Sequence, residues 1–378
     1  MEVEQARWAA QRGWQPGAPG RLGDRAHLLL AFGGTTLMKD GRLFDELRRA
    51  YPRAHLLGCS TAGEISGIQV TDDTLVATAV RFEATAVAGA AVTVRDSDAS
   101  AEAGAALGRA LDPRGLVHVL VLSDGLHVNG SALVRGLTHG LPSHVTITGG
   151  LSGDGPRFRE TLVAWDGPPA PRTVAAVGFY GDRLHVGHGS VGGWDPFGPE
   201  RLVTRSRGNV LYEVDGRPAL ALYKTYLGEH ANDLPASGLL FPLSLRTEHG
   251  AGLVRTILAV DEAEASMTFA GDVPEGAYVR LMKANFDRLI DGAVGAARAS
   301  HERLGAAPVD LAVLISCVGR KLVLRQRIEE EVEGVREVLG ERAALTGFYS
   351  YGEISPFTPT ARCELHNQTM TVTTFSER

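Results

Sequence analysis

The sequence predicts an α/β protein built from internally duplicated strand–helix–strand units, with added antiparallel hairpins and two pseudo-repeated halves. The first observation is a loop that occurs twice: residues 58–66 read GCSTAGEIS, and residues 347–355 read GFYSYGEIS. The second is that each copy follows a short apolar run preceded by a helical pattern. A chain that repeats one loop in one setting near both ends indicates internal duplication.

The elements of the first unit are predicted from apolar periodicity. Residues 1–25 are rich in glycine and proline and are expected to form an irregular N-terminal extension. The elements that follow are a strand at 27–32, a helix around 43–50, a strand at 54–57, a β-hairpin at 74–82 and 85–94, and a helix at 99–111.

The same order of elements then restarts. The second round is a strand at 117–122, a helix at 131–139 and a strand at 145–148; the third is a helix at 286–304, a strand at 309–316, a turn at 317–320, a helix at 322–339 and a strand at 343–346. Further strands are predicted at 160–165, 173–180, 183–190, 363–366 and 369–375. The unit thus occurs up to three times, and Gly153-Asp154 stands in the middle copy where the others have Gly-Glu. Open α/β sheets bind ligands at the carboxyl ends of such strands.

Composition and charge limit the possible partners. With 378 residues the chain exceeds one ordinary domain, and residues 198–218, rich in Gly, Pro and Arg, are the predicted boundary. A net charge of −6 without a basic block argues against nucleic acid. No apolar run reaches the ~18 residues of a spanning helix. Three scattered cysteines indicate neither a disulfide framework nor a metal site, so a reduced, cytoplasmic protein without membrane insertion is expected.

Residues 187–192 (GHGSVG) match the dinucleotide-binding pattern G-x-G-x-x-G. In that fold the pattern must open a helix whose N-terminus receives the pyrophosphate. Here Pro196 and Pro199 follow, and they prevent such a helix. We therefore do not predict nucleotide binding at this position.

The first copy of the repeated loop is also close to a nucleophile elbow, G-x-S-x-G, with Ala62 in place of the second glycine. Ser60 or Cys59 would then act as the nucleophile of a hydrolase or transferase, together with a base that the sequence does not nominate. A tight turn made of small residues explains the same pattern, and the second copy has aromatic residues at these two positions. We therefore predict that the protein is not an enzyme.

The glutamates of the two loops have two open interpretations. Glu64 and Glu353 either make a structural capping bond in each copy or together hold the ammonium group of a ligand. Arg320 lies at a predicted strand end, where it either binds a carboxylate or is a solvated surface residue. The acidic run at 329–333 is predicted to be a solvated helix face.

Five separated motifs are similar to those of the FIST family, a two-part sensory module. They are GCSTAGEI at 58–65, GNVLYEVDGRPA at 208–219, SCVGR at 316–320, GFYSYGEI at 347–354 and LHNQT at 365–369. The resemblance implies a FIST N-like domain at 26–214 and a FIST C-like domain at 215–378. It further implies binding of small ligands, amino acids among them, in signal transduction. Since no kinase, cyclase or methyl-accepting segment is recognised, a separate signalling protein is the expected partner.

We therefore expect a ligand in a cleft between the two halves. The candidate ligand-binding residues are Ser60, Thr61, Glu64, Asp154, Cys317, Arg320, Tyr349, Tyr351, Glu353 and Asn367. Arg320 would bind an acidic group, the two loop glutamates an amino group, and one of the tyrosines the apolar part of the ligand. No cofactor is expected; the alternative is haem in a nitric-oxide-responsive sensor, with a histidine or cysteine as axial ligand.

Overall fold

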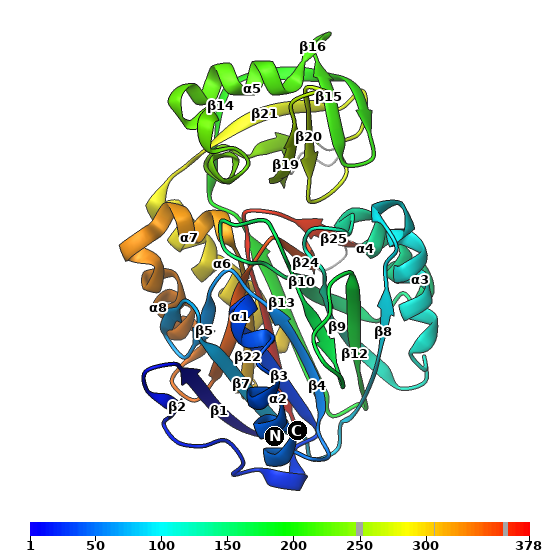
Figure 1. Cartoon of the computed structure of the whole chain (residues 1–378). Coiled ribbons are helices and arrows are strands. Elements are labelled where there is room, and N and C mark those ends of the chain that lie inside the picture. Colours follow the sequence, from blue (N-terminus) through cyan, green and yellow to red (C-terminus); the bar gives the residue numbers. More distant parts are fainter. Residues whose placement is uncertain (247–251, 306, 358–361) are drawn as a thin grey trace.

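Three six-stranded sheets form the core, and a smaller, mainly antiparallel domain lies at one end of it (Figure 1). The computed structural model describes residues 1–246, 252–305, 307–357 and 362–378. The α/β class predicted from the sequence is confirmed. Within the described residues, no helix has both the length and the apolar character needed to cross a membrane.

All three sheets follow one plan, in which two central parallel strands are extended on both sides by antiparallel ones. The first sheet contains, in spatial order, β11 (Val163–Trp165), β4 (His55–Ser60), β3 (Leu28–Gly33), β7 (Leu75–Arg81), β1 (Glu2–Ala9) and β2 (Gly13–Gln15). The second contains β25 (Cys363–His366), β24 (Gly352–Pro356), β10 (Thr146–Leu151), β9 (Leu116–Ser123), β12 (Thr173–Tyr180) and β8 (Ala86–Thr93). The third contains β13 (Leu184–Val191), β26 (Met370–Glu377), β22 (Leu311–Cys317), β23 (Ala344–Ser350), β5 (Glu64–Ser66) and β6 (Gln69–Thr71).

Helices connect the two parallel strands of each sheet. These crossovers are α1 (Thr35–Met38) with α2 (Gly41–Ala50), then α4 (Gly130–Gly140), and finally α7 (Val318–Leu324) with α8 (Ile328–Leu339). Two further helices, α3 (Ser100–Ala110) and α6 (Phe286–Leu304), pack against α4 and α8. Asn129 and Asn285 are the N-cap residues of α4 and α6. The side-chain oxygen of each accepts a hydrogen bond from a backbone N–H in the first turn, which is why asparagine is favoured at this position.

The three units exchange strands in a closed ring. The strand that follows the first unit's parallel pair, β5, joins the third sheet beside β23. The corresponding strand of the third unit, β24, joins the second sheet beside β10, and that of the second unit, β11, joins the first sheet beside β4. The repeat is therefore threefold, and each unit completes the sheet of a neighbour.

Equivalent backbone positions join the units at the centre of this ring. The three hydrogen bonds run from Ala62 N to Tyr349 O (2.8 Å), from Gly153 N to Ser60 O (3.0 Å) and from Tyr351 N to Leu151 O (3.1 Å). The glycine at the start of each loop is equivalent too: a Cβ on Gly58, Gly149 or Gly347 would lie within 2.5 Å of a carbonyl oxygen on the parallel neighbour strand. Close backbone approach thus explains the repeated glycine.

The termini complete the threefold arrangement. Strand β7 is followed by β8 at the edge of the second sheet, and β12 is followed by β13 at the edge of the third sheet. The equivalent position in the first sheet, beside β7, is taken by β1 at the start of the chain, and β2 forms the edge outside it. The Met1 ammonium lies 3.7 Å from the carboxylate of Glu377, at the end of β26, and the two termini are side by side in Figure 1.

The smaller domain is inserted between β13 and α6, so we call it the inserted domain (residues 194–284; Figure 1). Its strands are β14 (Trp194–Arg207), β15 (Val210–Val214), β16 (Arg217–Pro218), β17 (Leu243–Leu245), β18 (Leu253–Arg255), β19 (Ile257–Asp261), β20 (Ser266–Phe269) and β21 (Tyr278–Ala284). They form one curled sheet with α5 (Ala219–Leu227) and a separate apolar core around Leu211, Tyr223 and Phe269.

Several predicted elements differ from the structure. Residues 2–9, expected to be irregular, form β1, because β7 offers a partner strand. The segments 74–82 and 85–94 are strands but do not form a hairpin with each other, since β7 pairs in the first sheet and β8 in the second. The expected helix at 322–339 is interrupted at Arg325, which has a positive φ of 50°. Residues 198–218, the stretch predicted to contain the domain boundary, form part of the sheet of the inserted domain.

Candidate functional site

A cavity of about 340 Å³ with several charged residues in its lining lies at the carboxyl ends of the central strands, and all three units line it. The first unit contributes Thr61 and Glu64 from the repeated loop and Asp72 from the turn before β7. The second contributes Arg157, from the loop after β10, and the third contributes Lys321 from α7. A volume of this size falls at the lower end of the range typical of small-molecule sites.

Lys321 is the central cation of this cavity. Its side chain is only 16% exposed, and its Nζ donates to the carbonyl oxygen of Ala62 (2.9 Å) and forms an ion pair with Asp72. The same ammonium lies 5.6 Å from the ring centre of Tyr349. Gly63 makes room for it, since a Cβ there would lie 2.3 Å from Nζ. The glycine before Glu64 therefore makes room for this ammonium in the first copy of the loop.

Glu64 is the buried acid of the cavity. Its carboxylate accepts the hydroxyl of Thr61 and both the backbone N–H (3.0 Å) and the hydroxyl (2.7 Å) of Thr74. Burial raises the pKa of Glu64 to about 7, although these hydrogen bonds and Lys321 favour the charged form. A cation that approaches this carboxyl group would lower its pKa again.

Glu353 makes the same bonds in the third unit but lies elsewhere. Its carboxylate accepts the hydroxyl of Ser350 and the N–H (3.1 Å) and hydroxyl (3.0 Å) of Thr369. Burial raises its pKa to about 8. The described lining of the 340 Å³ cavity includes Glu64 and does not include Glu353. The structure therefore does not bring the two glutamates into one cavity. Each instead binds a threonine of its own unit, Thr74 before β7 or Thr369 before β26.

Cys317 and Asn367 lie near Glu353, on the side of the core that faces the inserted domain. Cys317 is fully buried, and burial raises the pKa of its thiol. The Asn367 amide donates to Tyr351 O (3.0 Å) and accepts from the backbone N–H of Thr256 in the inserted domain (3.2 Å). These bonds join the core to the inserted domain.

Arg320 and Tyr349 belong to a buried network with Glu331. The guanidinium is fully buried and pairs with the Glu331 carboxylate (2.8 and 3.0 Å), while its other bonds reach the carbonyl oxygens of Gly192 (3.1 Å) and Leu289 (2.6 Å). The Tyr349 hydroxyl donates to the same carboxylate (2.7 Å). Glu331 thus lies in the interior, in contrast to the solvated helix face expected for 329–333. Arg320 fixes α7, the helix that carries Lys321.

Ser60, Asp154 and Tyr351 lie at the centre of the ring and are buried. The Ser60 hydroxyl oxygen accepts the N–H of Leu162 (2.9 Å). Asp154 accepts three consecutive backbone N–H groups, at 158–160, together with the hydroxyl of Tyr351. Asp154 therefore organises its own loop and does not take the place of the repeated glutamate.

The cysteine of the possible nucleophile elbow is poorly placed for catalysis. Cys59 is fully buried, and burial raises the pKa of its thiol well above the usual value. Thiolate, the reactive form, is therefore disfavoured there. Neither Cys59 nor Ser60 belongs to the described lining of the 340 Å³ cavity.

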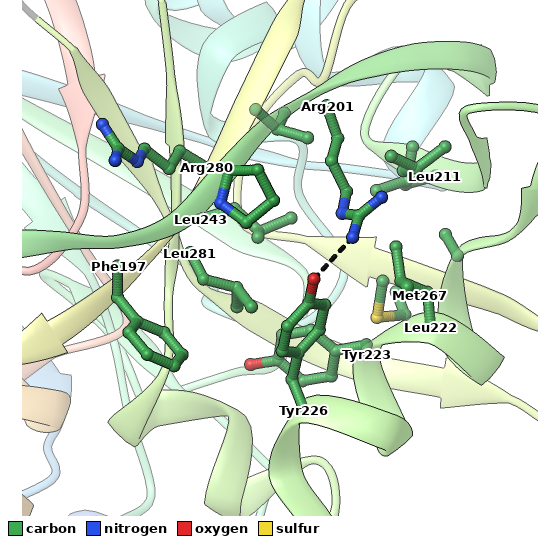
Figure 2. A pocket seen from close by; sticks show the side chains of 14 residues that line it. Phe197, Arg201, Leu211, Leu222, Tyr223, Tyr226, Leu243, Met267, Arg280 and Leu281 are labelled. Carbon is green, nitrogen blue, oxygen red and sulfur yellow. Dashed lines mark hydrogen bonds between the residues drawn. The ribbon is translucent and has the colours of Figure 1, made fainter.

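A second hollow lies inside the inserted domain, and Figure 2 shows its lining. Most of its side chains are apolar, and Arg201 donates to the hydroxyl of Tyr226 (2.5 Å). Its volume of about 30 Å³ corresponds to roughly one water molecule. This hollow is too small for an amino acid and is best described as a gap in the core of the inserted domain.

A haem group needs an axial ligand beside a wide cavity. His188 lines a cavity of about 820 Å³, but its Nδ1 accepts an N–H from Arg303 (2.5 Å). Burial lowers the pKa of this ring to about 4, so the ring is neutral and carries its proton on Nε2. Neither nitrogen then offers a free lone pair to iron, and this histidine does not fit the role.

Of the ten candidate residues, Thr61 and Glu64 line the cavity, and four charged lining residues were not predicted: Asp72, Asp73, Arg157 and Lys321. Lys321 follows the SCVGR motif directly and is one of only four lysines, which is a signal that sequence analysis can detect. The other three lie in turns without a repeat or motif, so only the fold reveals them.

Two family models together match most of the chain. The model of the FIST N domain matches residues 27–217, and that of the FIST C domain matches residues 219–356. An uncharacterised protein of Mycobacterium tuberculosis is 29% identical over 253 residues, which are 63% of this chain and 63% of that protein. An uncharacterised protein of Methanocaldococcus jannaschii is 23% identical over 210 residues, 50% of this chain and 39% of the relative.

The chain thus spans less than two thirds of the length of these curated relatives. Among solved structures, cyanuric acid hydrolase from A. caulinodans aligns with 100% of this chain and 99% of its own, at 9% identity and a TM-score of 0.39. A likeness this weak carries no argument about activity.

Proposed function

The chain belongs to the FIST family, and from this premise we propose that it senses a small zwitterionic metabolite of the amino-acid class. FIST domains are associated with small-ligand sensing in signal transduction. The ligand binds in the 340 Å³ cavity between Lys321 and the repeated loop. The signal passes to a separate partner protein in the cytoplasm.

The observation that carries this proposal is that side chains of both charges line the same small cavity. Lys321 and Arg157 offer cations to a carboxylate, while Asp72, Asp73 and Glu64 offer acids to an ammonium group. An α-amino acid carries both charges on one carbon and satisfies both sets at once. Arg320, the carboxylate partner expected from the sequence, is fully buried against Glu331. Lys321 lines the cavity, and its partner Asp72 is exposed, so Lys321 takes this role in the proposal.

Substitution of Lys321 by methionine is expected to weaken amino-acid binding by about tenfold or more, because a charge-assisted bond is lost. The measurement is titration calorimetry with the twenty amino acids at pH 7. Lys224→Met is the matched control, since Lys224 lies on α5 of the inserted domain and pairs with Glu262 at the surface. Equal affinity in Lys321→Met and the original chain would move the ligand to another site, and no binding of any amino acid would refute the ligand class.

A further inference from the structure

We propose that a second ligand site, specific for an oxyanion, lies in the cleft between the core and the inserted domain, with Arg255 as its principal residue. The cleft has a volume of about 730 Å³. Its walls are α4, β25, the end of β18 and the loop before β21. None of these residues lines the cavity at Lys321, so the two proposals stand independently.

Arg255 is a buried cation that the described residues leave without a charged partner. Its side chain is 4% exposed, and its guanidinium donates to Asp272 O (3.0 Å), Leu365 O (3.0 Å), Val254 O (3.3 Å) and the Ser131 hydroxyl (3.4 Å). All of these acceptors are neutral. Among the described residues, no carboxylate lies within ion-pair distance of this guanidinium. Burial accordingly lowers its pKa to about 10.

A buried charge of this kind is unfavourable unless an opposite charge meets it. The cleft contains the acids Asp272 and Glu364, but the Asp272 carboxylate is engaged by Arg135 and by the amide of Asn129. Glu364 lies on an exposed position of β25. Neither acid therefore forms an ion pair with Arg255, and a ligand that enters the cleft can supply the missing negative charge.

The remaining cations define the ligand class. Arg135 and Arg246 also line the cleft, and Arg246 lies over the ring of Tyr278 (4.4 Å). Each is already paired with an acid, Asp272 or Glu200, which offsets its charge, so Arg255 remains the cation that selects the ligand. A planar guanidinium matches the paired oxygens of a carboxylate or phosphoryl group. A small molecule with one such oxyanion fits the cleft.

The position of Arg255 connects this site to both parts of the molecule. Arg255 belongs to the inserted domain, while two of its acceptors, Leu365 O on β25 and the Ser131 hydroxyl on α4, belong to the core. An anion bound here contacts both walls of the cleft. Its binding energy therefore stabilises the observed arrangement of the two domains.

The test is thermal unfolding of the full chain in rising concentrations of succinate or inorganic phosphate, at an ionic strength held constant with chloride. A ligand that binds only the folded state raises the unfolding temperature in a saturating way. We expect such a rise with one of the two anions, and that anion identifies the oxyanion as a carboxylate or a phosphoryl group. No rise above the chloride control with either anion would refute the site.

Two variants locate the effect. Arg255→Met is expected to lose the anion-dependent rise, whereas Arg207→Met, which removes an exposed arginine of β14 in the same domain, keeps it. Arg255→Lys retains the charge without the planar fork and is expected to bind about tenfold more weakly. It serves as the decisive variant if Arg255→Met does not fold. A rise that is unchanged in either Arg255 variant would overturn the assignment.

Discussion

Substitution of Arg320 by methionine is expected to lower the free energy of unfolding by about 3–5 kcal/mol, the usual effect of breaking a fully buried ion pair from one side. Methionine keeps the length of the side chain but leaves the Glu331 carboxylate buried without its cation. It also removes the donor from two carbonyl oxygens, on Gly192 and Leu289. The measurement is urea unfolding at pH 7.

A second variant separates the lost pair from lost packing. In Arg320→Met with Glu331→Gln, no unpaired charge remains, while the amide oxygen still accepts from Ser316 and Tyr349. We expect this double variant to recover much of the lost stability, which a double-mutant cycle measures. The matched control is Arg327→Met, because Arg327 is half-exposed and ion pairs at the surface add little stability. A loss in Arg320→Met no larger than in this control would contradict the prediction.

Local patterns in the sequence predict the elements well because each pattern depends on residues close in the chain. Helix α6 (Phe286–Leu304) and strand β25 (Cys363–His366) have the bounds that periodicity predicts. The repeated loop also appears as expected, after the second parallel strand of the first and third units. The glycine that starts the loop allows close backbone approach, and the loop glutamate accepts a bond from the residue that precedes β7 in the first unit and β26 in the third.

The pairing of strands is where sequence reasoning fails, because an alternating strand indicates which residues face a core but not which strand lies beside it. The segments β7 and β8 are adjacent in the chain and alternate like a hairpin, yet they lie in different sheets. The reason is that the three units exchange strands. Such an exchange depends on contacts between residues that are hundreds of positions apart in the sequence. Residue pairs such as Gly347 and Ile65 in β23 and β5 show this range.

The candidate site shows the same limit at the level of single side chains. Arg320 and Lys321 are adjacent in the sequence, and both are basic. One is buried against Glu331, and the other lines the cavity, because α7 presents neighbouring positions to different surroundings. In the acidic run at 329–333, charge alone cannot distinguish Glu331, which is buried, from Glu333, which is exposed. Only the tertiary partner makes this distinction.

The two repeated glutamates predict an unusual pH dependence of stability. In the unfolded chain a glutamate titrates near 4.5, whereas burial raises the pKa to about 8 for Glu353 and to about 7 for Glu64. The folded state therefore holds these two protons between those values, and the stability that the two carboxyl groups contribute falls as pH rises from about 5 to 8. The buried histidines His118, His188 and His366, whose pKa values burial lowers, contribute in the opposite direction as pH rises toward 6.5. With about 1.4 kcal/mol for each unit, the loss is on the order of 3 kcal/mol from Glu353 and 2 kcal/mol from Glu64.

Urea unfolding at pH 5, 6, 7 and 8 measures this slope, and Glu353→Gln identifies its source. Glutamine has no charged form, so the variant is expected to lose about 3 kcal/mol less than the original chain across this interval, while its carbonyl oxygen still accepts from Thr369. Glu337→Gln, at an exposed position of α8, is the control and should leave the slope unchanged. An equal slope in Glu353→Gln and in the original chain would show that burial does not hold this carboxyl group in its protonated form.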